Sequence, residues 1–145
     1  MSAATALIVE TTADEECPLE FLGESADIVY FVSFAHSERY GAGHPLAKAA
    51  GLLKRRLGVD LKPLLTYADA RAESSEEEAA LESMWQDAAR LAASARSAAD
   101  AIAATTEARE LTAAFPELPE RLRELAAMAD WAAERGARVR LTYVL

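Results

Sequence analysis

Asp27-Ile-Val-Tyr-Phe-Val-Ser-Phe34 decides the fold that the sequence predicts. The run is almost continuously apolar and consists largely of β-branched and aromatic residues, which favour strands. A strand that is covered on both faces shows such a run in place of an alternating pattern. The pattern therefore predicts that 27–34 is the central strand of a sheet.

Three further segments complete a predicted sheet of about four strands. Residues 4–10 and 59–67 are rich in β-favouring types, although Pro63 pushes the second of these toward an edge. Residues 137–144 alternate between apolar and polar side chains, as in a half-buried strand. The order of these strands cannot be derived from the sequence.

Helices are predicted by apolar residues at steps of three and four. The helix expected at 45–57 begins at Pro45 and ends before Gly58, and it joins 27–34 to 59–67 in a predicted βαβ unit. A long helix is expected over 75–104, where Ser75-Glu-Glu-Glu78 has the form of a capping box.

The rest of the helical half follows that long helix. A short helix is expected at 107–114, and a second long one at 118–135 ends at Gly136. Together these elements predict one α/β domain over residues 1–145, with α+β as the alternative and the helical 75–135 segment covering one face of the sheet.

The net charge of the chain limits the kinds of partner that we expect it to bind. The chain carries 24 acidic and 15 basic side chains, a formal net charge of −9. Such a charge repels the phosphate backbone of nucleic acids, so we expect no nucleic-acid partner. Residues 1–27 contain seven carboxylates and neither Lys nor Arg, whereas 36–65 contain six basic and two acidic side chains.

Cysteine content and hydropathy bear on the location of the protein. Cys17 is the only cysteine, which excludes an intrachain disulfide and any Cys-x-x-Cys motif. No apolar run approaches the 18 or so residues that span a bilayer, and no secretory signal is apparent. We therefore expect a cytoplasmic protein without a membrane partner.

The loop after the predicted central strand is the candidate ligand site. It contains both histidines of the chain, and a loop at the carboxyl end of a parallel strand is where open sheets bind ligands. The candidate residues are His36, Glu38, Arg39, Gly41, Gly43 and His44. The amides at the start of the 45–57 helix, with Arg39, could hold a small anion.

Two other interpretations of this loop stay open. His36, Glu38 and His44 are suitable zinc ligands, but their spacing matches no known metal signature. Alternatively, His44 caps the helix, His36 is solvated and the glycines only form the turn. The sequence determines neither a cofactor nor a catalytic residue.

Two functions from different classes follow. The first is a non-catalytic interaction or regulatory module, of the immunity-protein or antitoxin kind, that binds a basic partner or forms a homodimer. An apolar stripe left exposed on the 75–104 or 118–135 helix would favour self-association. The alternative is a small anion- or metal-binding protein or enzyme that uses the 36–45 loop.

Overall fold

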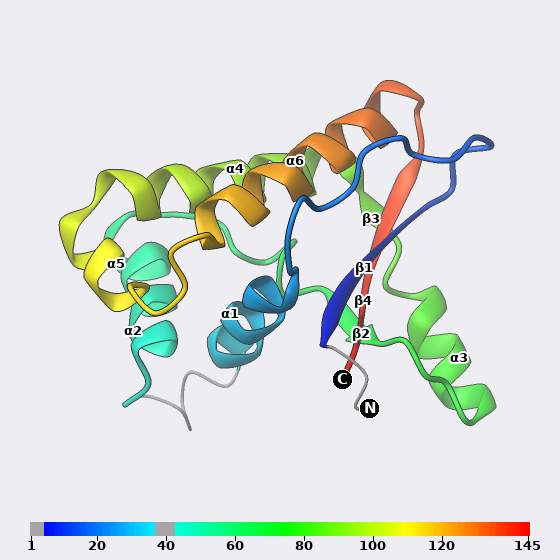
Figure 1. The fold of residues 1–145 in the computed structure, drawn as a ribbon. Coiled ribbons are helices and arrows are strands. Elements are labelled where there is room, and N and C mark those ends of the chain that lie inside the picture. The colour runs from blue at the N-terminus through cyan, green and yellow to red at the C-terminus, as the bar shows by residue number, and fades with distance from the viewer. Residues whose placement is uncertain (1–4, 37–42) are drawn as a thin grey trace.

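The computed structural model describes residues 5–36 and 43–145. The fold is α/β, with a mixed sheet of four strands and a larger helical part (Figure 1). The strands are β1 (Ala6–Thr11), β2 (Tyr67–Asp69), β3 (Gln86–Asp87) and β4 (Arg138–Val144). The helices are α1 (Ala26–His36), α2 (Pro45–Gly51) continued by the π-helical turn Leu52–Arg56, α3 (Ser75–Glu82), α4 (Ala88–Ala104), α5 (Thr106–Leu111) and α6 (Leu118–Glu134).

β4 is the centre of the sheet. β1 pairs with it in antiparallel register, from Ala6 opposite Val144 to Thr11 opposite Val139. On its other side β4 pairs in parallel with β2 and, nearer its start, in antiparallel with β3. β1 is therefore an edge strand of the sheet that the described residues form.

The helices cover the sheet unequally. In Figure 1, α4 and α6 lie side by side and, with α1 and α2, occupy one side of the sheet, while α3 stands on the other. The core lies mainly between the helices and the inner face of the sheet. Its largest fully buried side chains include Phe31 of α1, Leu46 of α2, Leu91 of α4, Leu122 of α6 and Leu141 of β4.

The segment predicted as the central strand is the helix α1, so the prediction for 27–34 is wrong. Ile28, Val29, Phe31, Val32 and Ala35 are buried, whereas Tyr30 is 41% exposed. This burial follows the helical spacing, which the almost unbroken apolar run also satisfies. The predicted βαβ unit therefore has no first strand, and the parallel crossover of the fold runs from β2 to β4.

The predicted strand 59–67 is also wrong except at its last residue. Leu65 donates to the carbonyl of Leu61 at 3.0 Å, and the amide of Lys62 donates to Asp60 Oδ1 at 3.0 Å. An Asp side chain that accepts from the backbone two residues on forms a turn, and Pro63 fixes φ within it. β2 accordingly begins only at Tyr67.

The predicted long helix 75–104 is divided into two helices. Gln86 and Asp87 leave the helical path and pair with β4, and Asp87 Oδ2 accepts from the amide of Arg90 at 3.1 Å, which starts α4. The N-cap of α3 is Ser74, not Ser75: its Oγ accepts from the amide of Glu77 at 3.1 Å.

Other sequence predictions are confirmed. The strand predicted at 4–10 is β1, which ends one residue later at Thr11, a strand occurs within 137–144, and helices occur within 45–57 and 118–135. Gly58 and Gly136 both have φ of 66° directly after helices, where residues with a side chain are disfavoured. The short helix predicted at 107–114 is α5, which ends earlier at Leu111.

Candidate functional site

The predicted ligand loop is only partly described. Glu38, Arg39 and Gly41 lie outside the described residues, so their assignment as ligand-binding residues stays a prediction. His36 is exposed at the end of α1, where its ring meets Tyr67 edge-on at 6.2 Å. Gly43 is exposed, and a Cβ built on it would meet no described atom within 4 Å.

His44 has a structural role at the start of α2. Its Nδ1 accepts from the amide of Leu46 at 3.0 Å, and its ring stacks on Phe34 with centroids 3.7 Å apart and planes 9° apart. A side chain that accepts from the second residue after it caps the helix. The capping interpretation of His44 therefore has direct support, and its Nδ1 is occupied by this bond.

A different site lies between β1, the segment that follows it, and α6. We call it the β1–α6 pocket; its volume is about 460 Å³. Its apolar wall comes from Val9, Met128, Trp131 and Val139. The other described lining residues are Thr11, Ala13, Asp14, Glu15, Glu16, Cys17 and Leu19.

Three contacts fix the segment 12–25 and frame this pocket. Glu15 Oε1 accepts from Arg135 Nε at 2.6 Å at one end of the segment. The amide of Leu22 donates to Glu124 Oε1 at 3.3 Å, which ties the return of the segment to α6. Ser25 Oγ accepts from the amide of Leu7 at 2.9 Å and closes the frame beside β1. Figure 1 shows this excursion between β1 and α1.

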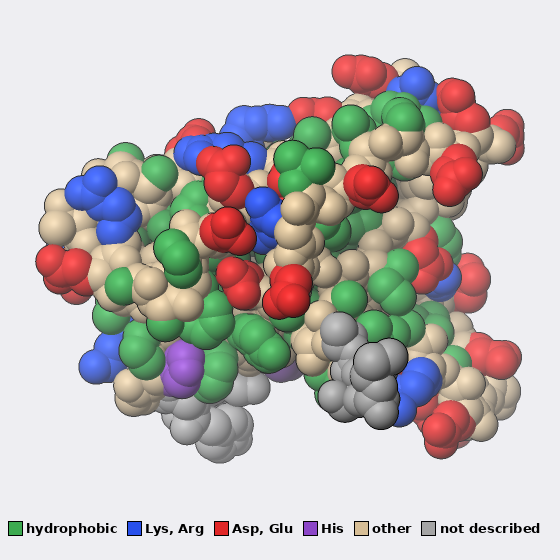
Figure 2. All heavy atoms as spheres, viewed as in Figure 1, with side chains coloured by type: hydrophobic (Ala, Val, Ile, Leu, Met, Phe, Trp, Pro, Cys, Tyr) green, Lys and Arg blue, Asp and Glu red, His purple; other side chains and the backbone are tan. Residues whose placement is uncertain are grey.

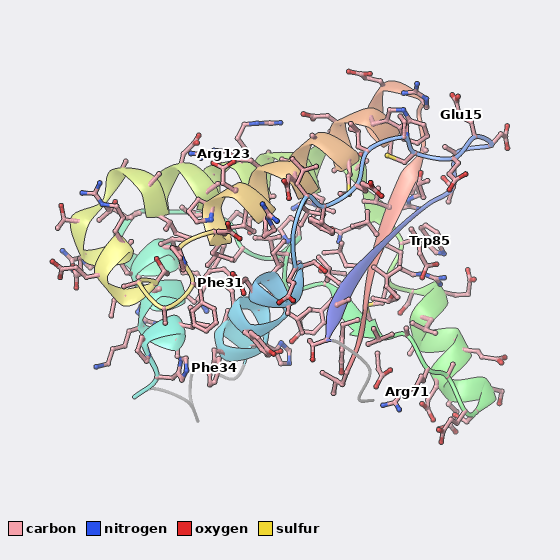
Figure 3. All side chains as sticks on the ribbon, viewed as in Figure 1. Glu15, Phe31, Phe34, Arg71, Trp85 and Arg123 are labelled. Carbon is pink, nitrogen blue, oxygen red and sulfur yellow. The ribbon has the colours of Figure 1, made fainter. Side chains whose placement is uncertain are left out.

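The rim of the pocket is strongly acidic. Asp14, Glu15 and Glu16 are consecutive and exposed, and Figure 3 places Glu15 at the tip of the segment. Only Glu15 has an ion-pair partner among the described residues. Figure 2 shows acidic side chains gathered where β1 and α6 end. No Lys or Arg is found among the described lining residues, and of these three carboxylates Arg135 pairs with Glu15 alone, so Asp14 and Glu16 leave the rim with net negative charge.

Arg135 shows how this region accommodates a cation. Its guanidinium lies 4.0 Å from the centroid of the Trp131 ring, and its Nη1 donates to the Trp131 carbonyl at 3.0 Å. Together with the bond to Glu15, these contacts place a guanidinium against an indole face and a carboxylate. Arg is well suited to both interactions, because its planar cation stacks on aromatic rings and pairs with carboxylates.

The pocket lining contains the one cysteine of the chain. Cys17 is half-buried in the wall, but no histidine accompanies it among the described lining residues. A Cys–His pair, as in thiol catalysis, is therefore not formed at this pocket by the residues the structure describes. The described chain likewise contains no cluster of three or more potential metal ligands.

The segments that form this pocket can be recognised in the sequence, but the contact between them cannot be predicted from it. The acidic run 14–16, Cys17 and the apolar face with Met128 and Trp131 are each visible along the chain. Their contact is not, because more than a hundred residues separate the acidic run from α6.

Comparison of the chain with protein-family models, with characterised proteins and with solved structures found no match. None of the described helices is both long and apolar enough to cross a membrane.

Proposed function

We propose that this protein is a non-catalytic interaction module that binds a basic segment of a partner protein at the β1–α6 pocket. The observation that carries the proposal is the combination of an apolar, Trp-containing wall with a rim of three consecutive carboxylates. An apolar centre and a charged rim are the usual anatomy of a protein-recognition patch. Arg135 on Trp131 illustrates the side chain that such a surface favours.

The spread of charge supports a peptide segment over a single small cation. Acidic residues extend from Glu10 to Asp27 without one basic residue, so the negative surface is longer than one amine or guanidinium. Complementary charge of this extent speeds encounter with a basic partner and disfavours nucleic acid.

Self-association through the helical stripes has no support. Leu91, Ala95, Ala98 and Ile102 of α4 are buried, as are Leu122, Leu125 and Ala129 of α6, and these two helices pack on each other. A stripe already covered within the chain offers no apolar patch to a second copy. A homodimer would need another surface.

The test is a titration of the isotope-labelled full chain with a basic peptide, acetyl-RVRVRV-amide, and with its acidic counterpart, acetyl-EVEVEV-amide. We expect the basic peptide alone to shift the amide signals of 13–17 and the indole signal of Trp131. The affinity should fall as salt is added, because exposed charges are screened. Bound peptide should also slow alkylation of Cys17, the only thiol in the chain.

A matched pair of double variants separates the pocket from general acidity. Asp14→Asn with Glu16→Gln should weaken binding of the basic peptide by about three- to tenfold, since exposed ion pairs contribute modestly. Glu76→Gln with Glu78→Gln makes the same change of charge on α3, across the sheet, and should leave the affinity unchanged. Equal binding of the acidic peptide, or signal shifts that map to α3, would overturn the proposal.

A further inference from the structure

The outer edge of β1 carries backbone groups that no described strand uses. β1 has β4 on one side only. The amide of Thr12 donates inward to Arg138, whereas the amide of Leu7 donates outward to Ser25. Because successive residues of a strand direct their N–H and C=O groups to opposite sides, the groups of Leu7, Val9 and Thr11 all face the outer edge.

Only the first of these three residues has a partner at that edge. Ser25 Oγ accepts from the Leu7 amide at 2.9 Å and lies 3.5 Å from the Leu7 carbonyl oxygen. Among the described residues, no hydrogen bond reaches the outward backbone groups of Val9 or the outward amide of Thr11. The segment 12–25 does not pair with these groups, and Ser25 bounds the unpaired part of the edge at Leu7.

The open edge and the pocket coincide. Val9 and Thr11, the two residues whose outward amides have no partner among the described residues, both line the β1–α6 pocket. A strand laid along this edge would direct alternate side chains to the same face as theirs. A Lys or Arg side chain on that face would lay its apolar stem along the pocket wall and bring its cationic end toward Asp14 and Glu16.

We infer that the basic partner segment binds as an added strand on the outer edge of β1, between Ser25 and the acidic run 14–16. The inference rests on the proposed function and specifies its binding mode. Addition of a strand to an exposed sheet edge is a recurrent mode of peptide recognition, in which backbone bonds supply affinity and pockets supply specificity. The pocket volume of about 460 Å³ suffices for one long side chain.

Charge identifies the occupant as a basic segment and not a second copy of this chain. Each copy has a formal net charge of −9, and residues 1–27 of a second copy would bring seven further carboxylates to the edge. Like charges at an interface oppose association. A segment that alternates Lys or Arg with β-branched residues has the complementary charge and the strand propensity.

Hydrogen exchange provides the direct test. In the complex with acetyl-RVRVRV-amide, exchange of the Val9 and Thr11 amides should slow by about tenfold or more, because each gains a backbone acceptor. The inward amides of Ile8 and Glu10 already face β4 and serve as internal references. Unchanged exchange at Val9 and Thr11 in the saturated complex would overturn the inference.

Two N-methylated forms of the peptide test the same bonds without altering the protein. One form is methylated at the three Arg amides and the other at the three Val amides, so charge and side chains are equal. An added strand directs only one set of amides toward β1, and that form should lose about tenfold or more in affinity while the other retains it. Equal affinities of both forms would contradict strand addition.

The outcomes distinguish the two proposals. If the affinity depends on Asp14 and Glu16 but is the same for both N-methylated peptides, the proposed interaction function is supported and strand addition is overturned. Absence of binding by the basic peptide would overturn both. Two measurements on the free protein complete the test: light scattering gives its oligomeric state, and hydrogen exchange shows whether the Val9 and Thr11 amides are already protected. A dimer in which both amides are protected would show that a second copy occupies the edge.

Discussion

Arg121 is the most deeply buried charge of the described chain, and its contacts explain the residues around the start of α1. Its side chain is 9% exposed, and its Nε lies 3.0 Å from Glu124 Oε1 without the alignment of a hydrogen bond. Its Nη1 lies against the backbone of Gly23, where a Cβ would approach to 1.9 Å. The lack of a side chain at Gly23 therefore leaves the space that the Arg121 guanidinium occupies.

Replacement of Gly23 should reveal this contact. The backbone at Gly23 does not have a positive φ, so an alanine is disfavoured by space alone. Gly23→Ala should cost about 1–2 kcal/mol of unfolding free energy, the usual cost of overpacking. In an Arg121→Gln background the same change should cost less than about 0.5 kcal/mol, since the two effects couple through one contact. Urea unfolding of the four proteins measures the coupling, and equal costs in both backgrounds would refute it.

Asp27 gives a prediction of pH dependence. Partial burial raises the pKa of its carboxyl above the ordinary 3.8, Glu117 and Glu24 add to the rise, and Arg121 opposes it. A raised pKa in the folded state means that protonation stabilises the fold below about pH 3.8 and that this stability is lost as the pH rises through the folded pKa.

Asp27→Asn should therefore be slightly more stable than the parent protein at pH 7 and equal to it at pH 3. The gain should be small, because the carboxyl is largely solvated and a negative charge in the first turn of a helix is itself favourable. Thermal melts at the two pH values measure it. A variant that is less stable than the parent at pH 7 would contradict the assignment.

At the scale of elements, α3 differs from every other helix of eight or more described residues in having no buried residue. At its C-terminal end Arg140 of β4 donates to the carbonyl of Leu81 at 3.1 Å, and at its start the cap at Ser74 holds it, where the Ser74 Oγ also donates to Glu77 Oε1 at 3.3 Å. A helix of this length with no buried residue is marginal in water.

Ser74→Ala should accordingly destabilise α3 while the rest of the molecule is unaffected. Loss of a Ser cap costs about 1 kcal/mol, which should raise the exchange rates of the α3 amides about fivefold. Ser75→Ala is the matched control: it lies one position inside the helix and should change these rates little. A larger effect of Ser75→Ala would show instead that Ser75 caps the helix, as the sequence predicted.

The division of 75–104 shows how an element boundary is decided. The apolar spacing continues from Leu81 through Ile102, so the sequence pattern contains no break. The first helix ends at Glu82, and Asp87 starts a second one because its carboxylate caps α4 while its backbone pairs with β4. Asp competes with helix continuation by accepting from nearby amides, and the neighbouring strand decides between the two outcomes.

At the scale of the whole molecule, the contact between α4 and α6 contributes most to the core. Leu125 is fully buried there. Leu125→Ala should cost about 3 kcal/mol and lower the melting temperature by roughly 10 °C in one cooperative transition. Leu22→Ala, at a side chain 84% exposed, is the control and should change the melt little. Similar shifts for both variants would show that this contact does not govern global stability.

The sequence by itself determined the elements whose pattern allows one answer. The strands near 4–10 and 137–144, the helices within 45–57 and 118–135, and the glycines that end two helices follow from local periodicity and backbone sterics. The α/β class and the acidic character follow from them and from the composition.

Only the tertiary structure decided the conformation of the segment 27–34 and the location of the candidate site. A nearly unbroken apolar run satisfies helical and strand periodicity alike, so its conformation depends on the surfaces it packs against, here α2 and α6. The β1–α6 pocket joins an acidic segment to a helix more than a hundred residues away. Such contacts arise when the chain buries its apolar faces, and no local pattern encodes which distant residues then meet.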